Sequence, residues 1–352
     1  IDGQWPLGAA AYEKRGLAVT VATWDPEKCI QCNQCSYVCP HATIRPFVLD
    51  EAEAAAAPAG TILQEAKGPK VKGLKYTLAV SPLDCMGCSV CVDVCPTNSL
   101  SMQPTEGQLP KQEIFDYCVA NVSEKEEACG TSVKDSQFKK PLLEFSGSCA
   151  GCAETSYARL VTQLFGDRMY IANATGCSSI WGNPAATSPY TVNAKGQGPA
   201  WCNSLFEDNA EFGLGMRVGH EAVRNELTLA TEAILDADVP VEVKEAATAW
   251  LDSREDSATT TAASAAYVAA LETIADNAAV AEEVKSILDR KEFLTKKSFW
   301  IFGGDGWAYD IGYGGVDHVL ASGQNVNIMV FDTEVYSNTG GQASKATPLG
   351  SI

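Results

Sequence analysis

The sequence is poor in basic residues and contains no long apolar run. Its 352 residues include 26 Lys and Arg against 44 Asp and Glu, which gives a formal net charge of −18. A nucleic-acid-binding surface needs clustered Lys and Arg, so this balance argues against one. No stretch approaches the roughly 20 consecutive apolar residues of a membrane helix, and no signal peptide is visible at the start. We therefore expect neither nucleic acid nor membrane as a partner.

The length and composition favour a folded chain of two domains. A chain of 352 residues is too long for one compact domain of ordinary size. Hydrophobic residues make up 46% of it, which is enough to form a large core. The chain starts at Ile1 without methionine and stops at Ile352 after a Gly/Ser/Thr-rich run. We interpret both ends as cut from a longer polypeptide.

Two short runs hold most of the 14 cysteines. The first is Cys29-Ile-Gln-Cys32-Asn-Gln-Cys35-Ser-Tyr-Val-Cys39-Pro40, and the second is Cys85-Met-Gly-Cys88-Ser-Val-Cys91-Val-Asp-Val-Cys95-Pro96. Each follows the pattern C-x2-C-x2-C-x3-C-P, which is the bacterial ferredoxin signature for two [4Fe–4S] clusters. Such clusters also indicate a reducing, cytoplasmic compartment.

The spacing predicts which cysteines share a cluster. Three cysteines at intervals of three wrap one face of a cubane, while the fourth belongs to the neighbouring cluster. Zinc sites would leave the third cysteine and the proline without a role, and disulfides do not require such runs. One cluster is therefore expected on Cys29, Cys32, Cys35 and Cys95, and the other on Cys85, Cys88, Cys91 and Cys39.

A third, incomplete set consists of Cys149-Ala-Gly-Cys152 and Cys177. Three thiolates brought together could hold a cubane with a fourth ligand from elsewhere, but buried unreactive cysteines are an equally good interpretation of the spacing. Cys118, Cys129 and Cys202 follow no pattern and are taken as ordinary cysteines.

After Cys149 the pattern of apolar residues changes to alternating helices and strands. A Gly/Pro/Ser/Thr loop extends to residue 199, and residues 101–148 before the change are predicted to be a polar connector. The charges of residues 239–290 are those of a solvated helix face. The last two strands and the helix between them predict a parallel sheet with a right-handed crossover. The expected helices are 155–165, 207–236, 239–290 and 307–322, and the expected strands are 168–174, 298–302 and 326–331.

Two loops at strand ends have the composition of a diphosphate site. Gly303-Gly304-Asp305-Gly306 ends a strand and opens a helix, where backbone amides favour phosphate and a carboxylate can bind Mg²⁺. The loop 332–341 follows the next strand and can add a hydroxyl and a carbonyl to the metal shell. Together the loops have the thiamine-diphosphate pattern; two tight turns are the alternative.

The order of these motifs resembles the single-chain pyruvate:ferredoxin (flavodoxin) oxidoreductase family along essentially the whole chain. The motifs are the double ferredoxin pattern, C-A-G-C-A-E-T, N-A-T-G-C-S-S-I-W-G, G-G-D-G-W-A-Y-D-I-G-Y-G-G and D-T-E-V-Y-S-N-T-G-G-Q-A-S-K-A-T-P. The resemblance implies an α+β ferredoxin-like two-cluster domain over 1–122. It implies an α/β thiamine-diphosphate domain over 123–352, with a parallel sheet and flanking helices, incomplete at its C-terminus.

The resemblance also implies roles for individual residues. Cys149, Cys152 and Cys177 would bind a third, proximal [4Fe–4S] cluster whose fourth ligand lies beyond Ile352; Ala153 stands where the family usually has Gly. Asn338 would lie near the reacting carbonyl. The Mg²⁺ ligands would be Asp305, the Thr333 hydroxyl and the Val335 carbonyl. The residues lining the cofactor would be Glu154, Cys177, Gly304, Asp305, Gly306, Trp307, Thr333, Glu334, Val335, Tyr336, Ser337 and Asn338.

The activity implied is oxidation of pyruvate with coenzyme A to acetyl-CoA and CO₂, with electrons passed to ferredoxin or flavodoxin. Family members are homodimers about three times longer, and the glutamate that activates the cofactor lies in segments outside this chain. This casts doubt on turnover by the chain alone. Another 2-oxoacid as substrate, or an electron-transfer subunit without catalysis of its own, are the alternatives.

Overall fold

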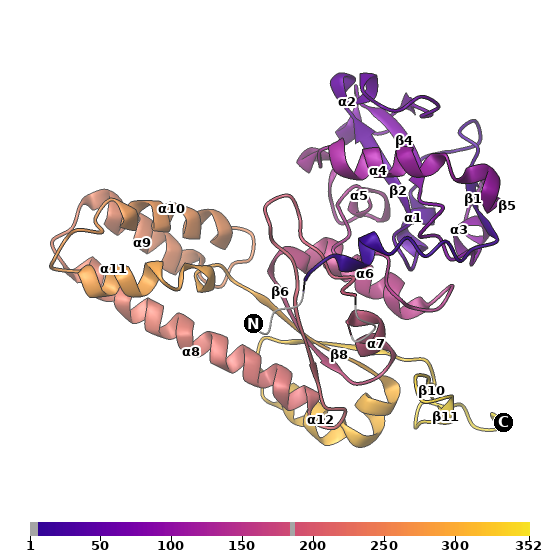
Figure 1. The fold of residues 1–352 in the computed structure, drawn as a ribbon. Coiled ribbons are helices and arrows are strands. Elements are labelled where there is room, and N and C mark those ends of the chain that lie inside the picture. Colours follow the sequence, from indigo (N-terminus) through magenta and orange to yellow (C-terminus); the bar gives the residue numbers. More distant parts are fainter. Residues whose placement is uncertain (1–5, 184–186) are drawn as a thin grey trace. The chain divides into compact units, whose positions relative to one another are not determined.

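The computed structural model describes residues 6–183 and 187–352, which fold into two compact units (Figure 1). Unit 1 comprises Ile1–Asp167, Thr175–Trp201 and Phe331–Ala343, and unit 2 comprises Arg168–Ala174, Cys202–Val330 and Ser344–Ile352. Both units are therefore built from separated segments, and the domain boundary at residue 122 remains a prediction. In the described part of the chain, no helix has the length and apolar character needed to cross a membrane.

Unit 1 contains two small antiparallel sheets. Strand β1 (Thr20–Trp24) pairs with β5 (Leu100–Pro104), so that Thr20 lies opposite Pro104. The second sheet has the order β2-β4-β3. Its strands are β2 (Ile44–Leu49), β4 (Lys75–Val80) and β3 (Gln64–Glu65). Each cysteine run contains a short helix that begins after its second cysteine, α1 (Gln34–Val38) or α3 (Val90–Asp93).

The two cysteine loops repeat the same backbone conformation. Gln31 and Gly87, two residues after the first cysteine of each run, have φ of 59° and 68°, and Asn33 and Ser89 have φ of 61° and 63°. Residues other than glycine rarely adopt this left-handed backbone conformation. Asn33 is held there by the Tyr76 hydroxyl, which donates to its side-chain oxygen at 3.0 Å. The repeat gives both loops the curvature needed to surround a central group.

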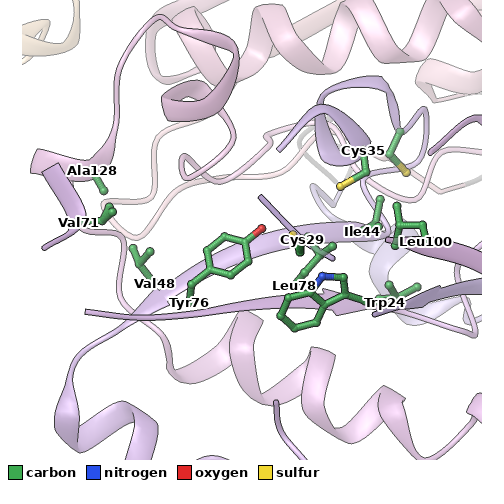
Figure 2. Close-up of a cluster of buried hydrophobic side chains, with 12 residues drawn as sticks. Trp24, Cys29, Cys35, Ile44, Val48, Val71, Tyr76, Leu78, Leu100 and Ala128 are labelled. Atoms are coloured by element: carbon green, nitrogen blue, oxygen red, sulfur yellow. The ribbon is translucent and has the colours of Figure 1, made fainter. Parts of the chain in front are cut away.

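The core of unit 1 is formed by apolar side chains and cysteine sulfurs together. Trp24 and Tyr76 meet edge to face with ring centroids 6.0 Å apart. Figure 2 shows Cys29 beside Leu78, and Cys35 belongs to the same cluster. The buried members are Trp24, Cys29, Cys35, Cys39, Ile44, Val48, Val71, Tyr76, Leu78, Val80, Leu100 and Ala128. Cysteine packs as a small apolar residue, so the metal-binding loops and the core are one structure.

The prediction of a polar connector over residues 101–148 is wrong. This segment contributes β5 and helices α4 (Lys111–Asn121) and α5 (Val133–Ser136), and Phe115 and Cys118 of α4 are buried. The prediction failed because the segment is mostly polar, and the few apolar residues that α4 buries were not recognised as one face of a helix. By contrast, the Ala-rich stretch after Leu49 is mostly exposed; it holds α2 (Glu51–Ala55), whose N-terminus is closed by a capping box between Asp50 and Glu53.

Unit 2 is built on a four-stranded sheet of order β7-β6-β8-β9. The strands are β7 (Ala200–Ser204), β6 (Met169–Ala174), β8 (Ser298–Gly304) and β9 (Asn327–Phe331). Strands β6 and β8 are parallel, in register from Met169 and Ser298, which agrees with the parallel sheet expected for this region, although the sequence did not single out this pair of strands. Helix α8 (Asn209–Asp236) packs on them closely at Gly213, where a Cβ atom would lie 2.4 Å from Ile301.

The helical segment after α8 forms three helices with their own core. They are α9 (Val241–Ser253), α10 (Thr260–Glu272) and α11 (Ala281–Leu288), and Trp250 and Tyr267 stack between them with centroids 5.7 Å apart. The helix predicted for residues 307–322 is interrupted: a π-helix over Gly306–Ile311 is followed by α12 (Tyr313–Ala321). The remaining elements are α6 (Ala153–Phe165), α7 (Cys177–Gly182), β10 (Val335–Tyr336) and β11 (Gln342–Ala343), and 3₁₀ turns at Ala9–Tyr12, Pro69–Val71, Thr105–Gln108, Glu126–Ala128, Gly166–Arg168 and Lys291–Phe293.

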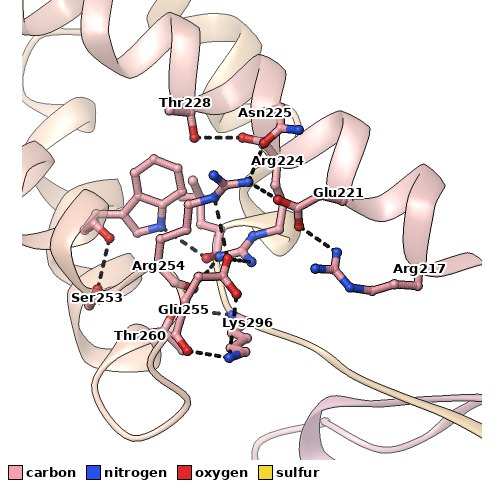
Figure 3. A network of polar contacts seen from close by, with 12 residues as sticks. Arg217, Glu221, Arg224, Asn225, Thr228, Ser253, Arg254, Glu255, Thr260 and Lys296 are labelled. Carbon is pink, nitrogen blue, oxygen red and sulfur yellow. Dashed lines mark hydrogen bonds and ion pairs between the residues drawn. The ribbon is translucent and has the colours of Figure 1, made fainter. Parts of the chain in front are cut away.

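Arginines of α8 and of the end of α9 form a polar network with glutamates (Figure 3). Arg217 and Arg254 both pair with Glu221, and Arg224 pairs with Glu255 at 3.1 Å. Arg224 is 2% exposed, so its charge is buried as well as paired.

His220, on the same helix, is buried without a hydrogen-bond partner for either ring nitrogen among the residues that the structure describes. Its ring lies against aromatic rings, 5.1 Å from both Phe293 and Phe299. Burial, and after it the nearby cations Arg224, Lys297 and Arg217, lower the pKa of His220 to about 4. The neutral ring is therefore the form that the fold accepts.

We expect the contribution of His220 to the free energy of unfolding to decrease as the pH is lowered. The unfolded chain binds the proton near pH 6.5 and the folded chain only near pH 4, so stability is full above pH 6.5 and is lost between these values. Between pH 7.5 and 5.5 the loss should be about 1 kcal/mol. Thermal unfolding of His220→Phe should show a correspondingly smaller decrease in melting temperature over this range. His318→Gln, at an exposed position of α12, is the control; an identical pH dependence in wild type and His220→Phe would contradict the assignment.

Candidate functional site

One cavity of unit 1 is surrounded by the second cysteine run and the last cysteine of the first. It encloses about 390 Å³, including space open to solvent, and its wall includes Cys39, Cys85, Cys88 and Cys91. Apolar side chains such as Ile44 and Val80 complete the wall. Below it is called the first cavity. An apolar wall with four converging sulfurs suits a thiolate-bound cluster.

A second cavity, of about 310 Å³, has the reciprocal composition. Its wall includes Cys29, Cys32, Cys35 and Cys95, together with Tyr76 and Leu78. The structure thus brings together the two sets of four that the spacing predicts, each with one cysteine from the other run. Their role as iron ligands remains a prediction. None of the 14 cysteines, all of which are described, forms a disulfide.

Backbone amides point at several of these sulfurs. The amides of Gln31, Thr43 and Ser99 donate to Cys29, Cys39 and Cys95 at 3.3, 3.4 and 3.2 Å. Hydrogen bonds of this kind stabilise negative charge on sulfur and tune the potential of a cluster. The arrangement of amides and sulfurs around the two cavities therefore fits a thiolate-bound group.

The same thiols differ in their ease of deprotonation. Burial raises the pKa of Cys35 and of Cys91 well above the ordinary value. At Cys95 burial acts in the same direction, but hydrogen bonds from Ser99 and Thr97 outweigh it and lower the pKa to about 7. Because a metal ligand must be a thiolate, cluster assembly on these sites releases protons.

The third set of cysteines lies at the starts of two helices. Cys152 is the N-cap of α6 and Cys177 is the first residue of α7. The indole N–H of Trp181 donates to the Glu154 carboxylate at 2.8 Å and joins the two helices. Glu154 is thereby buried in the structure, with its carboxylate engaged by α7.

Cys177 lies within electrostatic range of the other two thiols. Burial raises its pKa, a hydrogen bond from the Ser337 hydroxyl opposes this, and Glu154, Cys152 and Cys149 raise it further. The three thiols thus influence one another electrostatically, and their joint binding of one cluster remains a prediction. Among residues 6–183 and 187–352, no group of three or more His, Cys, Asp or Glu side chains is placed to hold a single metal ion.

The Cys149 loop lies against the second cysteine run. Gly151, with φ of 76°, would carry a Cβ atom only 3.6 Å from the Cβ of Cys88. On the same side, Nε2 of the buried His41 lies 2.9 Å from the Ser148 hydroxyl and 3.1 Å from its carbonyl oxygen. The third set is thus adjacent to the first cavity within unit 1.

The loop after β9 reaches Cys177. Its sulfur lies 3.2 Å from the Ser337 hydroxyl and 4.0 Å from the Asn338 side-chain oxygen. In the same loop the Thr333 hydroxyl donates to the Val335 carbonyl at 3.1 Å, and Glu334 between them has φ of 62°. The predicted hydroxyl and carbonyl ligands of Mg²⁺ are therefore side by side, with Tyr336 next to them in β10.

The Gly-rich loop belongs to unit 2. Asp305 follows β8 and is 1% exposed, and its carboxylate accepts a hydrogen bond from Ser344. Trp307 is fully buried; a Cβ atom on Gly303 or Gly312 would clash with it, at 2.3 or 2.5 Å. Its indole packs in the core of the unit, with Ala174 and Ile301, and Gly304 and Gly306 flank Asp305. The joint action of Asp305 and Thr333 on one metal ion remains a prediction.

Two polar residues near the cysteines were not found from the sequence. Arg159 is 1% exposed and donates from Nε to the Cys39 carbonyl at 3.0 Å, and His41 connects to Ser148 as described. Arg159 shares a face of α6 with Thr155 and Thr162, a periodicity visible in the sequence. Because the residues on this face of α6 are polar, the sequence did not indicate that the face is buried.

A family model described as a 4Fe-4S dicluster domain matches residues 28–99. Over its whole length the chain is 52% identical to a pyruvate-flavodoxin oxidoreductase of Klebsiella pneumoniae and 53% identical to a pyruvate:ferredoxin oxidoreductase of Moorella thermoacetica. It is also 47% identical, over 99% of its length, to a mitochondrial pyruvate dehydrogenase [NADP(+)] of Euglena gracilis, of which it covers 19%.

The chain is related over its whole length to one segment of pyruvate:ferredoxin and pyruvate-flavodoxin oxidoreductases. It spans 30% of the length of the first two of these relatives. The resemblance inferred from the motifs is confirmed, as are a ferredoxin-like 4Fe–4S domain and an α/β region with parallel strands. The dicluster match and the sulfur-lined cavities support iron–sulfur clusters as cofactors.

The exchange of cysteines between the runs can be tested by double substitution. Cys39→Ala and Cys85→Ala should each remove about four irons, and the double variant no more than either, because both residues serve one cluster. Cys29→Ala combined with Cys85→Ala should remove about eight. Iron and sulfide analysis after anaerobic reconstitution gives the counts, with Cys118→Ala as a control that loses none. Additive loss in the Cys39/Cys85 pair would rule the grouping out.

Proposed function

We propose that the chain supplies the electron-transfer sites, and part of the thiamine-diphosphate site, of an enzyme that oxidises pyruvate. The reaction would convert pyruvate and coenzyme A to acetyl-CoA and CO₂ and reduce ferredoxin or flavodoxin. The observation that carries the proposal is the adjacency, within unit 1, of three sulfur sets and the loop 333–338. The substrate and the carriers are those that the names of the chain's relatives, pyruvate-flavodoxin and pyruvate:ferredoxin oxidoreductase, contain.

The residues of the chain would act by placement. When bound, thiamine diphosphate supplies the electron sink for loss of CO₂, and [4Fe–4S] clusters supply one-electron carriers. Asp305, the Thr333 hydroxyl and the Val335 carbonyl would hold Mg²⁺, which prefers hard oxygen ligands. Asn338 would lie at the reacting carbonyl. Cys149, Cys152 and Cys177 would hold the proximal cluster next to the cofactor-binding loop.

The neighbours of the Cys149 loop support an order for the clusters of the relay. Gly151 lies against Cys88, so the site of the first cavity would come next after the proximal site. The second cavity, lined by Cys29, Cys32, Cys35 and Cys95, would then be the exit toward the external carrier. The enzyme would work as a homodimer, as family members do.

Two alternatives are distinguished by the cofactor loops. A related enzyme would oxidise another 2-oxoacid with the same clusters and metal loop. A subunit that only transfers electrons would have no need for Asp305 or the Thr333 hydroxyl. The buried carboxylate of Asp305 at a strand end therefore favours an enzyme.

We expect Asp305→Ala in the full-length enzyme to weaken thiamine-diphosphate binding at least tenfold and to abolish cofactor-dependent CO₂ release, because a metal ligand is lost. Cofactor binding is measured by calorimetry and CO₂ release from labelled pyruvate. Asp317→Ala, at an exposed position of α12, should behave as wild type. Undiminished CO₂ release at limiting Mg²⁺ would refute the site assignment.

Cys85→Ala should separate chemistry from electron transfer. Release of CO₂ in a single turnover should persist, whereas rapid reduction of external ferredoxin should be lost because the first-cavity cluster is missing. Stopped-flow absorbance of the acceptor measures this step. Normal ferredoxin reduction by an enzyme lacking about four irons would disprove the relay.

A further inference from the structure

Arg159 is a buried cation without a counter-ion. It lies on α6, the helix that Cys152 caps, and is 1% exposed. Its Nε donates to the Cys39 carbonyl at 3.0 Å and one terminal nitrogen donates to the Tyr37 carbonyl. The other donates to the side-chain oxygens of Gln137 and Gln163 at 2.9 and 2.6 Å.

All four partners of Arg159 are neutral. No ion pair to Arg159 is found within the described ranges, and arginine remains protonated in proteins. A fully buried charge that is hydrogen-bonded but not neutralised is costly, so such groups persist where an opposite charge is present in the working state.

A second buried arginine, which binds a carbonyl three residues further along the same loop, shows the usual arrangement. Arg45 donates from Nε to the Ala42 carbonyl at 2.6 Å, as Arg159 does to the Cys39 carbonyl, but it also pairs with the buried carboxylate of Glu144. Two guanidinium groups thus flank the segment from Cys39 to Ala42, and only one has an acidic partner. The charge that would balance Arg159 should therefore be sought near Cys39.

Cys39, whose carbonyl accepts the hydrogen bond from Arg159, is part of the wall of the first cavity. Each thiolate ligand of a cluster there would bring negative charge, and reduction would add one electron more, donated by the upstream cluster as that cluster is oxidised. We propose that Arg159 is the fixed counter-cation of this site and raises the reduction potential of the cluster held by Cys39, Cys85, Cys88 and Cys91. The inference rests on the proposed function, because it needs a cluster in the first cavity.

The physical effect has a definite sign. A fixed positive charge stabilises the more negative, reduced state more than the oxidised one, and low polarity around the site strengthens the interaction. Arg159 therefore favours arrival of the electron at the first cavity from the Cys149 side. The residue touches no substrate, so it acts as a positioning and potential-setting residue.

Four variants of the full-length enzyme separate charge from hydrogen bonding. Arg159→Gln removes the charge and should lower the ratio of reduced to oxidised first-cavity cluster about tenfold at a given ambient potential, which is 59 mV for one electron. Arg159→Lys keeps the charge and should stay within threefold of wild type. Gln137→Glu leaves Arg159 in place but supplies the missing carboxylate, so it should lower the ratio as Arg159→Gln does. The control, Arg45→Gln with Glu144→Gln, removes a cation together with its anion and should change the ratio least.

Redox titration followed by EPR, with iron analysis of every variant, gives the result. The inference is supported if the shift follows charge and falls mainly on one cluster signal. It is overturned if Arg159→Lys shifts the potential as much as Arg159→Gln, which would indicate a purely structural cap of α1. It is also overturned if Gln137→Glu, with a full complement of iron, leaves all potentials unchanged, even should Arg159→Gln fail to fold. Wild type without clusters would refute the proposed function and this inference together.

Discussion

The wall of each sulfur-lined cavity of unit 1 takes three cysteines from one run and the fourth from the other run. Cys39 ends the first run but faces the cavity of the second, and Cys95 does the reverse. The two loops must therefore pack against each other before either cavity is complete. Since Cys29, Cys35 and Cys39 also belong to the apolar core with Trp24 and Tyr76, formation of the sites and formation of the fold are coupled.

This coupling explains why the backbone of the loops is so restricted. Gln31 and Asn33 occupy left-handed conformations that non-glycine residues rarely adopt. Both side chains are buried, and each is fixed by partners outside the loop: Gln31 by the carbonyl of Glu65, and Asn33 by Tyr76 and the carbonyl of Lys134. The insertion between the runs and the segment after it thus support the first loop, although neither provides a cysteine to it.

The sequence predicted well those features that depend on spacing along the chain. The strand that begins at Ser298 and the long helix that ends at Asp236 follow from local periodicity. The motif spacing also predicts that each cavity wall takes one cysteine from the other run, whereas iron binding there remains a prediction. Features that depend on tertiary burial could not be predicted. Phe115 and Cys118 anchor a segment whose composition is that of a loop, and Trp307 folds back between two glycines in a π-helix.

Of the candidate site, residue types were predictable but their neighbours were not. The motif identified Cys149, Cys152 and Cys177, whereas the contact of Gly151 with Cys88 and the bond between Glu154 and Trp181 require the fold. Arg159 is the clearest case. In the sequence it is one arginine on an amphipathic helix, where a charge is expected to face solvent. Only its burial, beside an Arg45 that has Glu144, shows that a positive charge has been left unpaired next to Cys39. In a chain with a net charge of −18, a cation enclosed without an acid is best explained by negative charge that the amino acids alone do not supply.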